Sequence, residues 1–383
     1  MKRILAMALV ALATVTGSGV AQVPAGNPSA DLAATLEAIR AEAGLPALAG
    51  LVVHADGSVE VAATGKRRLD GGDPVTPADR WHIGSNTKSM TAVLAARLVE
   101  AGRLSWGTTL AEAFPDLAPS MHADWRPVTL EQLLGMRAGA PEDIGNLSAW
   151  GAFWANKKPL PALRKELVAE VTAKPPVAKP GTAWAYSNPS YVMAGAMLEA
   201  RTGQPWEELM REYLFAPLGL ATAGFGAPPG PDQPWGHARP LVPVLLKPTP
   251  MDPAGGKADN PPALGPAGTV HLSLADYGTY LRAVVDGANG RGTLLTPESW
   301  QRLLTPGLQD YALGWGVRAA PWAGDRPALG HAGSNTMWFL NARVAPARGF
   351  AVAAASNSAS GGAEGAVTKA LGALIKRAEA RAP

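Results

Sequence analysis

The spacing of apolar and polar residues along the first part of the chain predicts the order helix, strand, strand. Leu32, Leu36 and Ile39 recur at helical spacing behind Ser29, which suits an N-cap. Residues 47–65 then form two apolar runs around an Asp-Gly pair, the strongest short-range signal for a β-hairpin. The chain therefore opens with a helix followed by a hairpin.

Residues 81–102, WHIGSNTKSMTAVLAARLVEAG, are predicted as an apolar helix with a serine and a lysine at its start. Residues 142–180 are mixed in pattern and are expected to hold loops and short helices. Further helices are predicted from three start signals: a capping box of Thr129 and Gln132, the pair Asn188-Pro189, and Ser273 with Asp276. The middle of the chain is therefore mostly helical.

The last third of the chain contains three strand-like runs, YALGWGV, PALGHAGSNTMWFLNARVAP and GFAVAAASNS, before a final helix at about residues 362–380. Strands at both ends with helices between them predict an α/β (α+β) fold, with one sheet built from both chain ends and a helical region beside it. An active site is expected at the junction of the two.

One domain is expected over residues 22–383. Its sheet part covers about 30–85 and 266–383, and its helical part covers about 86–225. Residues 226–266 are crowded with proline and glycine, so they are expected to form an irregular surface excursion, in the manner of a lid.

The first 21 residues are predicted to be a secretory signal peptide. Lys2 and Arg3 precede an apolar run, and the small residues Gly19 and Ala21 suit a cleavage site. The mature chain is expected to start near Gln22 and to be periplasmic or secreted. No later run is apolar over the roughly 18 or more residues that a membrane span needs.

Composition excludes several classes of function. The sequence has no cysteine, which excludes disulfides, thiolate catalysis and cysteine metal sites. Removal of the leader would remove two of the 34 basic residues. The remaining basic residues are nearly balanced by the 31 acidic residues, so the mature chain is expected to be almost neutral. The sequence contains no cluster of basic residues of the kind that binds nucleic acid, so no nucleic-acid partner is expected. The histidines show no spacing typical of metal ligands, so a metallohydrolase is not expected.

Three places in the sequence are able to carry chemistry, and the first is Ser85 with Lys88. Residues three apart on a helix share a face, so the lysine amine is within reach of the serine hydroxyl. A buried lysine with a lowered pKa can then act as the base that activates the serine. The alternative is a capping serine beside a solvated lysine, and the pair alone does not decide between them.

The second place is PGTAWAYSNPSY, where Tyr186 and Asn188 lie just before a predicted helix. A phenol near a lysine ammonium can shuttle protons, and an amide beside it can bind a substrate. The alternative is a packed tyrosine followed by Asn188 as the N-cap.

The third place is the strand-like run around His331, Gly333 and Ser334. A glycine within a strand marks the close approach of another backbone or of a ligand. The N–H groups of Ser334 and Ser85 are then candidates for an oxyanion hole. An ordinary packed histidine is the alternative for His331.

Taken together and in this order, Ser-x-x-Lys, Tyr-x-Asn and His-x-Gly resemble the serine β-lactamase and penicillin-binding-protein superfamily, in particular its class C β-lactamase-like branch. Segments such as VTLEQLL, PGTAWAYSNPSYVMAG and PAGTVHLSLADYGTYL extend the resemblance from about Ala30 to Lys376. The branch also holds esterases, D-aminopeptidases and DD-peptidases.

The resemblance implies a β-lactamase/transpeptidase-like fold and acyl transfer without a cofactor. Ser85 would be the nucleophile, with Lys88 and Tyr186 as the proton-transfer pair. Asn188 would hydrogen-bond the substrate or orient Lys88, and Gly333 and Ser334 would border the site.

Two departures from the family pattern bear on the substrate. His331 stands where class C β-lactamases carry a lysine that helps to bind the substrate carboxylate. A histidine with a pKa of about 6.5 is mostly neutral at pH 7, which favours an esterase or D-amino-acid peptidase over an efficient β-lactamase. The segment LLGMRAGAP also departs, so no substrate contact is carried over from that loop.

Other hypotheses are a true β-lactamase, a DD-carboxypeptidase, or a catalytically silent protein that binds peptidoglycan peptides on the same fold. The intact serine, lysine and tyrosine argue against the silent protein. Four tryptophans fall in segments able to wall a cleft but are interpreted as packing residues: Trp150, Trp154, Trp184 and Trp235.

Overall fold

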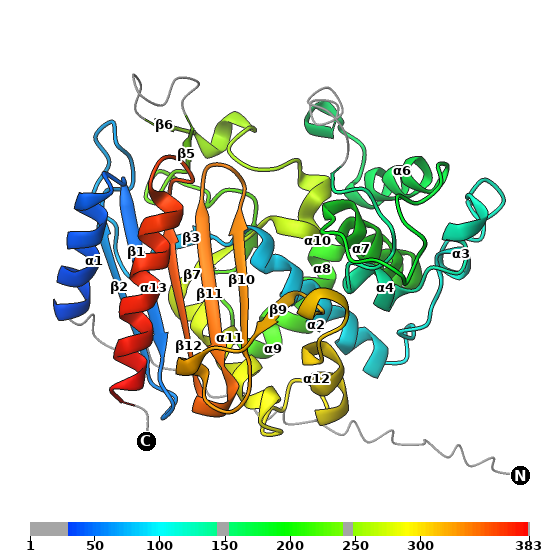
Figure 1. The fold of residues 1–383 in the computed structure, drawn as a ribbon. Helices are drawn as coiled ribbons and strands as arrows, with labels where there is room; N and C mark the ends of the chain where they lie inside the picture. The colour runs from blue at the N-terminus through cyan, green and yellow to red at the C-terminus, as the bar shows by residue number, and fades with distance from the viewer. Residues whose placement is uncertain (1–29, 144–152, 240–247, 382–383) are drawn as a thin grey trace, which may run out of the picture.

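A seven-stranded antiparallel sheet joins the two ends of the chain (Figure 1), in the order β2-β1-β12-β11-β10-β9-β8. The computed structural model describes residues 30–143, 153–239 and 248–381, so the expected leader and Trp150 lie outside the described residues. The strands are β1 (Ala47–Val53), β2 (Val59–Gly65), β8 (Tyr311–Ala312), β9 (Trp315–Arg318), β10 (Ala328–Ser334), β11 (Phe339–Ala345) and β12 (Phe350–Ser356). The predicted sheet from both chain ends is confirmed.

The hairpin of β1 and β2 forms as the sequence predicts. Gly57 in its turn has a φ of +88°, which glycine adopts without a steric cost. The first strand also pairs with the last strand, with Val52 opposite Val352. Every residue of β1 and of β12 is buried, because helices cover both faces of the sheet.

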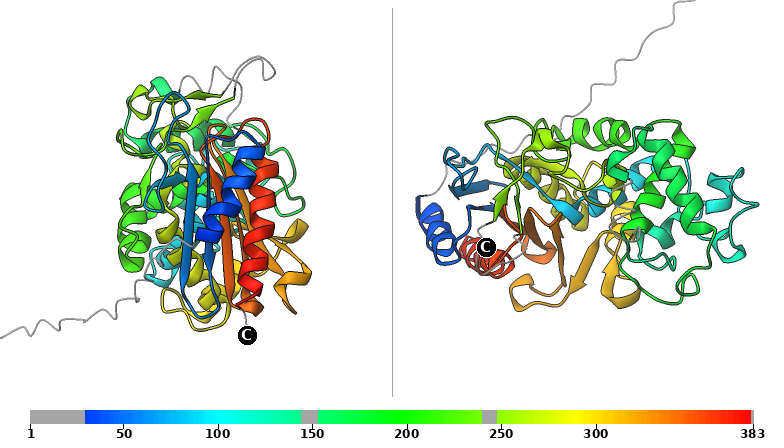
Figure 2. Two further views of the ribbon diagram at one scale, coloured as in Figure 1. Left: turned by 90° about the vertical axis from the view of Figure 1, so that its left-hand side faces the viewer. Right: turned by 90° about the horizontal axis from the view of Figure 1, so that it is seen from above.

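Helices from the two ends of the chain cover one face of the sheet. Figure 2 shows α1 (Ala30–Glu42) and α13 (Ala363–Glu379) side by side on it. A Cβ at Gly50 in the sheet would lie 3.1 Å from both Leu36 of α1 and Leu374 of α13. On the opposite face α11 (Leu274–Ala288) packs close to β1, with Gly278 set over Leu51. Alternate residues of β1 therefore contribute to two separate apolar layers.

The helical region lies beside the sheet, on the side away from α1 (Figure 1). Its central helix α2 (Thr87–Glu100) is buried along almost its whole length. The capping box predicted at Thr129 is confirmed at the start of α4 (Leu130–Leu134). The other α-helices of this region, among the residues that the structure describes, are α3 (Leu110–Ala113), α6 (Leu160–Thr172), α7 (Asn188–Thr202), α8 (Trp206–Met210) and α9 (Ala216–Leu218).

A small second sheet, β3-β7-β4, connects the two regions. It consists of β3 (Arg80–His82), β7 (Val270–Ser273) and β4 (Gly224–Phe225). The described parts of the proline- and glycine-rich segment hold only β5 (His237–Ala238), β6 (Thr249–Pro250), 3₁₀ turns and the beginning of α10 (Gly265–Gly268), in agreement with its predicted irregularity.

Three sequence predictions differ from the structure. Trp81 and His82 belong to a strand, because they pair with Leu272 and His271 of β7, and not to a helix over residues 81–102. Residues 142–180, which were expected to hold loops and short helices, contain α6, a helix of 13 residues. The amphipathic α12 (Pro297–Leu304), capped by Thr296, was not anticipated. Among the described helices, none has the length and apolar character to cross a membrane.

Candidate active site

Ser85 lies on a 3₁₀ turn, Gly84–Asn86, between the end of β3 and the start of α2. Gly84 has a φ of +52°, and a Cβ there would lie 2.4 Å from the backbone nitrogen of Ser334. Only glycine permits this approach. The serine is partly exposed, whereas Lys88 one turn later is fully buried. The turn thus keeps the predicted spacing of the pair although no continuous helix joins the two residues.

Lys88 donates to three acceptors from three parts of the chain. Its Nζ lies 3.0 Å from Ser85 Oγ, 2.9 Å from Asn188 Oδ1 and 2.7 Å from the carbonyl oxygen of Ala267. These acceptors match the three hydrogens of an ammonium group. The solvated lysine of the alternative interpretation is therefore wrong.

Burial lowers the pKa of Lys88, and the nearby Tyr186 and Asp143 oppose this shift in part. Since desolvation disfavours the charged form, the Lys88 amine gives up its proton more readily than the amine of an exposed lysine. A neutral amine 3.0 Å from Ser85 Oγ is able to accept its proton.

Tyr186 and Asn188 come from the segment that starts α7. Lys88 Nζ lies 4.9 Å from the centre of the Tyr186 ring. The N-cap of α7 is Ser187, whose hydroxyl accepts from the N–H of Ser190. The alternative interpretation of Asn188 as the N-cap is therefore wrong, and the Asn188 side chain accepts a hydrogen bond from Lys88 instead.

The third group of residues lies at the end of β10. A Cβ at Gly333 would lie 2.2 Å from the carbonyl oxygen of Ile83 and 2.6 Å from the backbone nitrogen of Ser85. The close backbone approach expected of this glycine is confirmed. The strand and the Ser85 turn are thus in direct contact, and the backbone N–H groups of Ser85 and Ser334 belong to the two touching segments.

His331 is buried on β10, with its ring centre 6.3 Å from that of Tyr186. Its Nδ1 lies 2.7 Å from the carbonyl oxygen of Ala332. Burial, and after it the charge of Lys88, lowers the pKa of His331 to about 3. The side chain is therefore neutral near pH 7, as expected from its residue type.

The structure brings all seven predicted residues to one place, the junction of the sheet and the helical region. Two neighbours were missed by sequence reasoning. Ala267 contributes only its backbone carbonyl oxygen. Because every residue has such an oxygen, the sequence gives no sign of this contact. Tyr311 packs its ring against His331 at 6.4 Å and against Trp184 at 5.7 Å, which supports the packing role predicted for Trp184.

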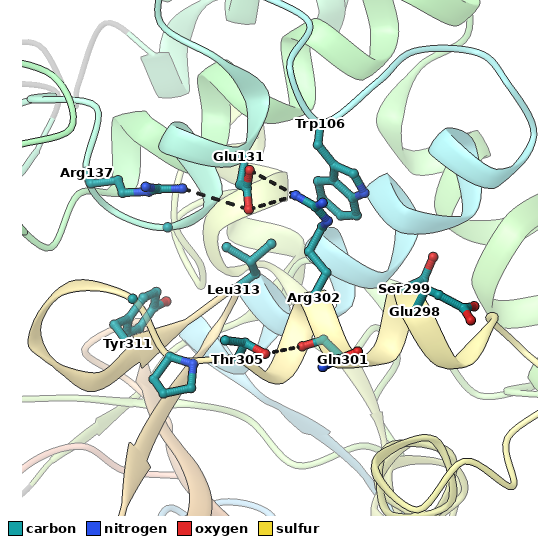
Figure 3. Close-up of a pocket in the computed structure, with 13 residues that line it drawn as sticks. Trp106, Glu131, Arg137, Glu298, Ser299, Gln301, Arg302, Thr305, Tyr311 and Leu313 are labelled. Carbon is teal, nitrogen blue, oxygen red and sulfur yellow. Dashed lines mark hydrogen bonds and ion pairs between the residues drawn. The ribbon is translucent and has the colours of Figure 1, made fainter.

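A cavity of about 680 Å³ lies between α12, the end of α4 and β8 (Figure 3). Arg302 in its wall is ion-paired with Glu131 and lies over the ring of Trp106. None of the seven residues lines this cavity, although Tyr311 does. Within the described ranges, no group of three or more His, Asp or Glu side chains is arranged to hold a metal ion.

Comparison with known proteins gives a consistent picture. A family model described as Beta-lactamase matches residues 32–376. Penicillin-binding protein 4 of Amycolatopsis lactamdurans is 28% identical over 330 residues, which cover 84% of this chain and 83% of that protein. Lovastatin esterase of Penicillium rubens is 32% identical over 180 residues, covering 43% and 44% of the two chains. A solved structure described as SurE with D-Leu has a TM-score of 0.70 at 26% identity, over 92% of this chain and 75% of that one.

Proposed function

The chain belongs to the beta-lactamase family and is a serine hydrolase, and from that premise we propose that Ser85 forms an acyl-enzyme on ester or amide carbonyl groups. The observation that carries the proposal is the buried Lys88 amine at 3.0 Å from Ser85 Oγ. A protein that only binds a ligand has no evident need for this costly arrangement, so the silent binding protein is the weaker hypothesis.

Acylation begins when Ser85 Oγ attacks the carbonyl carbon. Its proton passes to the pair of Lys88 and Tyr186, while the carbonyl oxygen gains negative charge facing the N–H groups of Ser85 and Ser334. The bond to the alkoxide or amine leaving group then breaks, and the pair returns the proton to that group. Lys88 Nζ lies 4.9 Å from the centre of the Tyr186 ring, so we assign the proton to the two residues together.

Deacylation repeats the steps with water. The proton-transfer pair accepts a proton from the attacking water, the bond from Ser85 Oγ to the carbonyl carbon breaks, and the serine hydroxyl is restored. Asn188 Oδ1 accepts a hydrogen bond of 2.9 Å from the Lys88 amine and so orients it. We assign Asn188 and His331 to the substrate-binding side of the site, together with Gly333 and Ser334.

The substrate class we favour is an ester or a peptide of D-amino acids. A neutral His331 gives no charge for a substrate carboxylate, which disfavours β-lactams that depend on one. The relative named as an esterase and the similar structure with D-Leu support this choice. A DD-carboxypeptidase is the second candidate, because a relative that matches 84% of this chain is named as a penicillin-binding protein.

The purified protein is expected to hydrolyse a short-chain p-nitrophenyl ester with a higher kcat/KM than nitrocefin. The reason is the missing cation at position 331, since loss of a charge-assisted hydrogen bond costs about 1.5–3 kcal/mol, or about tenfold or more. Steady-state kinetics with both substrates measures this ratio. A higher value for nitrocefin would identify a β-lactamase instead.

The pH dependence of nitrocefin hydrolysis tests whether His331 is uncharged. Because the pKa of His331 is lowered to about 3, the side chain gains no charge between pH 8 and pH 5.5. The KM for nitrocefin should therefore not improve over this interval, whereas a histidine with an ordinary pKa would become a cation. His331→Lys is expected to shift the ratio of rates toward nitrocefin.

We further propose that the protein is exported, on the strength of the leader pattern in residues 1–21. When the full chain is expressed in a bacterial host, the protein recovered outside the cytoplasm is expected to begin near Gln22. Intact-mass measurement of that fraction tests the cleavage. An uncleaved chain confined to the cytoplasm would contradict it.

A further inference from the structure

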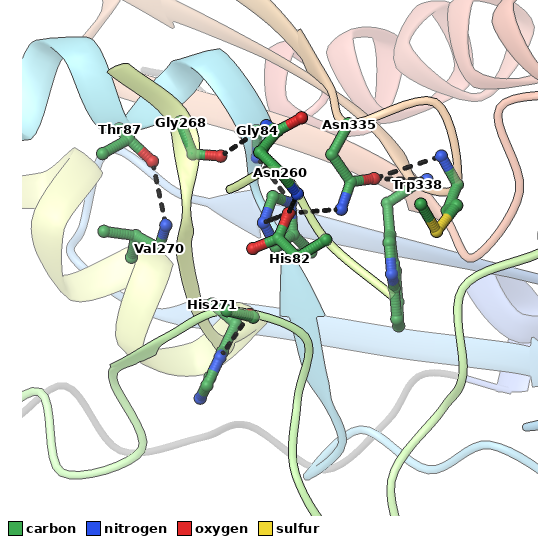
Figure 4. Close-up of polar contacts among 12 residues, drawn as sticks. His82, Gly84, Thr87, Asn260, Gly268, Val270, His271, Asn335 and Trp338 are labelled. Carbon is green, nitrogen blue, oxygen red and sulfur yellow. Dashed lines mark hydrogen bonds and ion pairs between the residues drawn. The ribbon is translucent and has the colours of Figure 1, made fainter. Parts of the chain in front are cut away.

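The residues that flank the two oxyanion-hole candidates are tied together by a buried polar network (Figure 4). It begins at His82, the last residue of β3, which is only 1% exposed. His82 Nδ1 accepts a hydrogen bond of 3.1 Å from the backbone N–H of Gly84. Since Nδ1 accepts this hydrogen bond, the N–H of the ring is on Nε2.

The protonated Nε2 faces a carboxylate from the proline- and glycine-rich segment. It lies 2.9 Å from Asp259 Oδ1. The approach lacks the alignment of a full hydrogen bond, so it is an electrostatic contact. Asp259 is itself 8% exposed, and its backbone carbonyl accepts from the indole N–H of Trp154.

The same carboxylate oxygen also holds the turn that follows β10. Asn335 Nδ2 donates to Asp259 Oδ1 at 2.7 Å. In turn, Asn335 Oδ1 accepts from the backbone N–H groups of Met337 and Trp338 at 3.1 and 3.0 Å. The ring of Trp338 packs edge-on against Trp81, the neighbour of His82. The strand that leads to Ser85 and the turn that follows Ser334 are therefore joined twice.

We propose that His82, Asp259 and Asn335 are positioning residues that set the separation of the oxyanion-hole donors. Gly84 immediately precedes Ser85, and Asn335 immediately follows Ser334, so one carboxylate fixes the two segments that present the N–H groups. The inference rests on the proposed function, because it takes these two N–H groups as the oxyanion hole.

Two properties of the network favour positioning over a purely structural role. A buried carboxylate is weak evidence for stability, because apolar residues of similar volume often serve a core as well or better. In addition, its contacts converge on the two backbone segments that adjoin the nucleophile. Donors held in place before the reaction stabilise the developing charge without having to reorganise.

Two isosteric variants of His82 test the proposal. In His82→Asn the amide oxygen takes the place of Nδ1 and still accepts from Gly84, whereas in His82→Gln the amide nitrogen takes the place of Nε2 and leaves the Gly84 N–H without its acceptor. For ester hydrolysis, His82→Gln should lower kcat about 100-fold with KM within about threefold, the signature of an interaction made only in the transition state. His82→Asn should retain a kcat within about tenfold of the wild type.

Thermal unfolding of both variants separates this effect from damage to the fold. A loss of kcat that is equal in the two variants and follows their Tm would overturn the proposal, as would an unchanged kcat in His82→Gln. Asp259→Asn, which keeps an acceptor for Asn335 but removes the charge beside His82, should lower kcat about tenfold, again with little change in KM.

¹⁵N NMR of the His82 ring tests the network independently of enzyme activity, because it shows which ring nitrogen carries the proton. The wild type should show an unprotonated Nδ1 and a protonated Nε2 near pH 7. A protonated Nδ1 would refute the network even if the enzyme hydrolyses esters. A wild type that shows the expected ring but no hydrolysis would instead refute the proposed function.

Discussion

Ser85→Ala is expected to lower ester hydrolysis by at least about 10⁴-fold, because it removes the atom that forms the acyl-enzyme. The wild type should gain the mass of one fluorophosphonate adduct on Ser85, and the variant should gain none. The fold should be retained, since the serine is partly exposed and Lys88 keeps its two other acceptors, Asn188 Oδ1 and the carbonyl oxygen of Ala267. Intact-mass spectrometry followed by peptide mapping measures the adduct and its position.

A matched control is Ser120→Ala, which removes an exposed hydroxyl that binds only the local backbone. This variant should be labelled as the wild type is. An adduct that persists in Ser85→Ala, or that maps to another residue, would show that Ser85 is not the nucleophile. A folded wild type that reacts with neither a fluorophosphonate nor a fluorescent penicillin would favour the binding protein.

Lys88→Met is expected to lower the acylation rate by about 10³-fold, within the usual contribution of a general base. Methionine fills the space but cannot accept the proton of Ser85. It also leaves Asn188 Oδ1 and the carbonyl of Ala267 without their donor. The loss of these hydrogen bonds destabilises the fold, whereas removing a buried amine removes its desolvation cost. Because the two effects oppose each other, the free energy of unfolding should change by no more than about 2 kcal/mol. Stopped-flow acylation and thermal melts measure the two effects.

The pH dependence of both effects follows from the lowered pKa of Lys88. The wild-type acylation rate should rise with pH as the lysine loses its proton, with a midpoint below about 10.4, the ordinary lysine value. The folded state binds this proton less tightly than the unfolded state does. The wild type should therefore gain stability relative to Lys88→Met as the pH rises toward that value, and lose it as the pH falls through the lowered pKa.

A surface variant controls for the change of residue type. Lys369→Met removes an exposed lysine paired with Glu42 and should leave the acylation rate and its pH profile as in the wild type. If Lys88→Met kept the rising pH limb, the limb would belong to another group, and Lys88 would not be part of the proton-transfer pair.

Much of the fold was predictable because its signals are local. Leu32, Leu36 and Ile39 mark the buried face of α1, and Ser273 caps α11 through the N–H of Asp276, both as expected. Trp81 and His82 were not predicted as a strand, because their partners in β7 are about 190 residues later in the chain. Pairing at that distance leaves no trace in the local pattern.

The site divides in the same way. Ser85, Lys88 and Tyr186 were predicted because their side chains form a recognisable ordered set, and the family model over residues 32–376 confirms the resemblance. The carbonyl of Ala267 and the contact of His82 with Asp259 were not predictable. The carbonyl contact depends on the backbone path of an irregular segment. Histidine and aspartate are common residue types on protein surfaces, so their positions in the sequence do not indicate a buried contact.

The pairing of β1 with β12 also constrains the order of folding. Leu48 lies opposite Ser356, so one edge of β1 lacks its neighbour until almost the whole chain has been synthesised. Closing so long a loop is entropically costly and slows folding. The last strand to leave the ribosome therefore completes the sheet, and β1 gains its second neighbour only then.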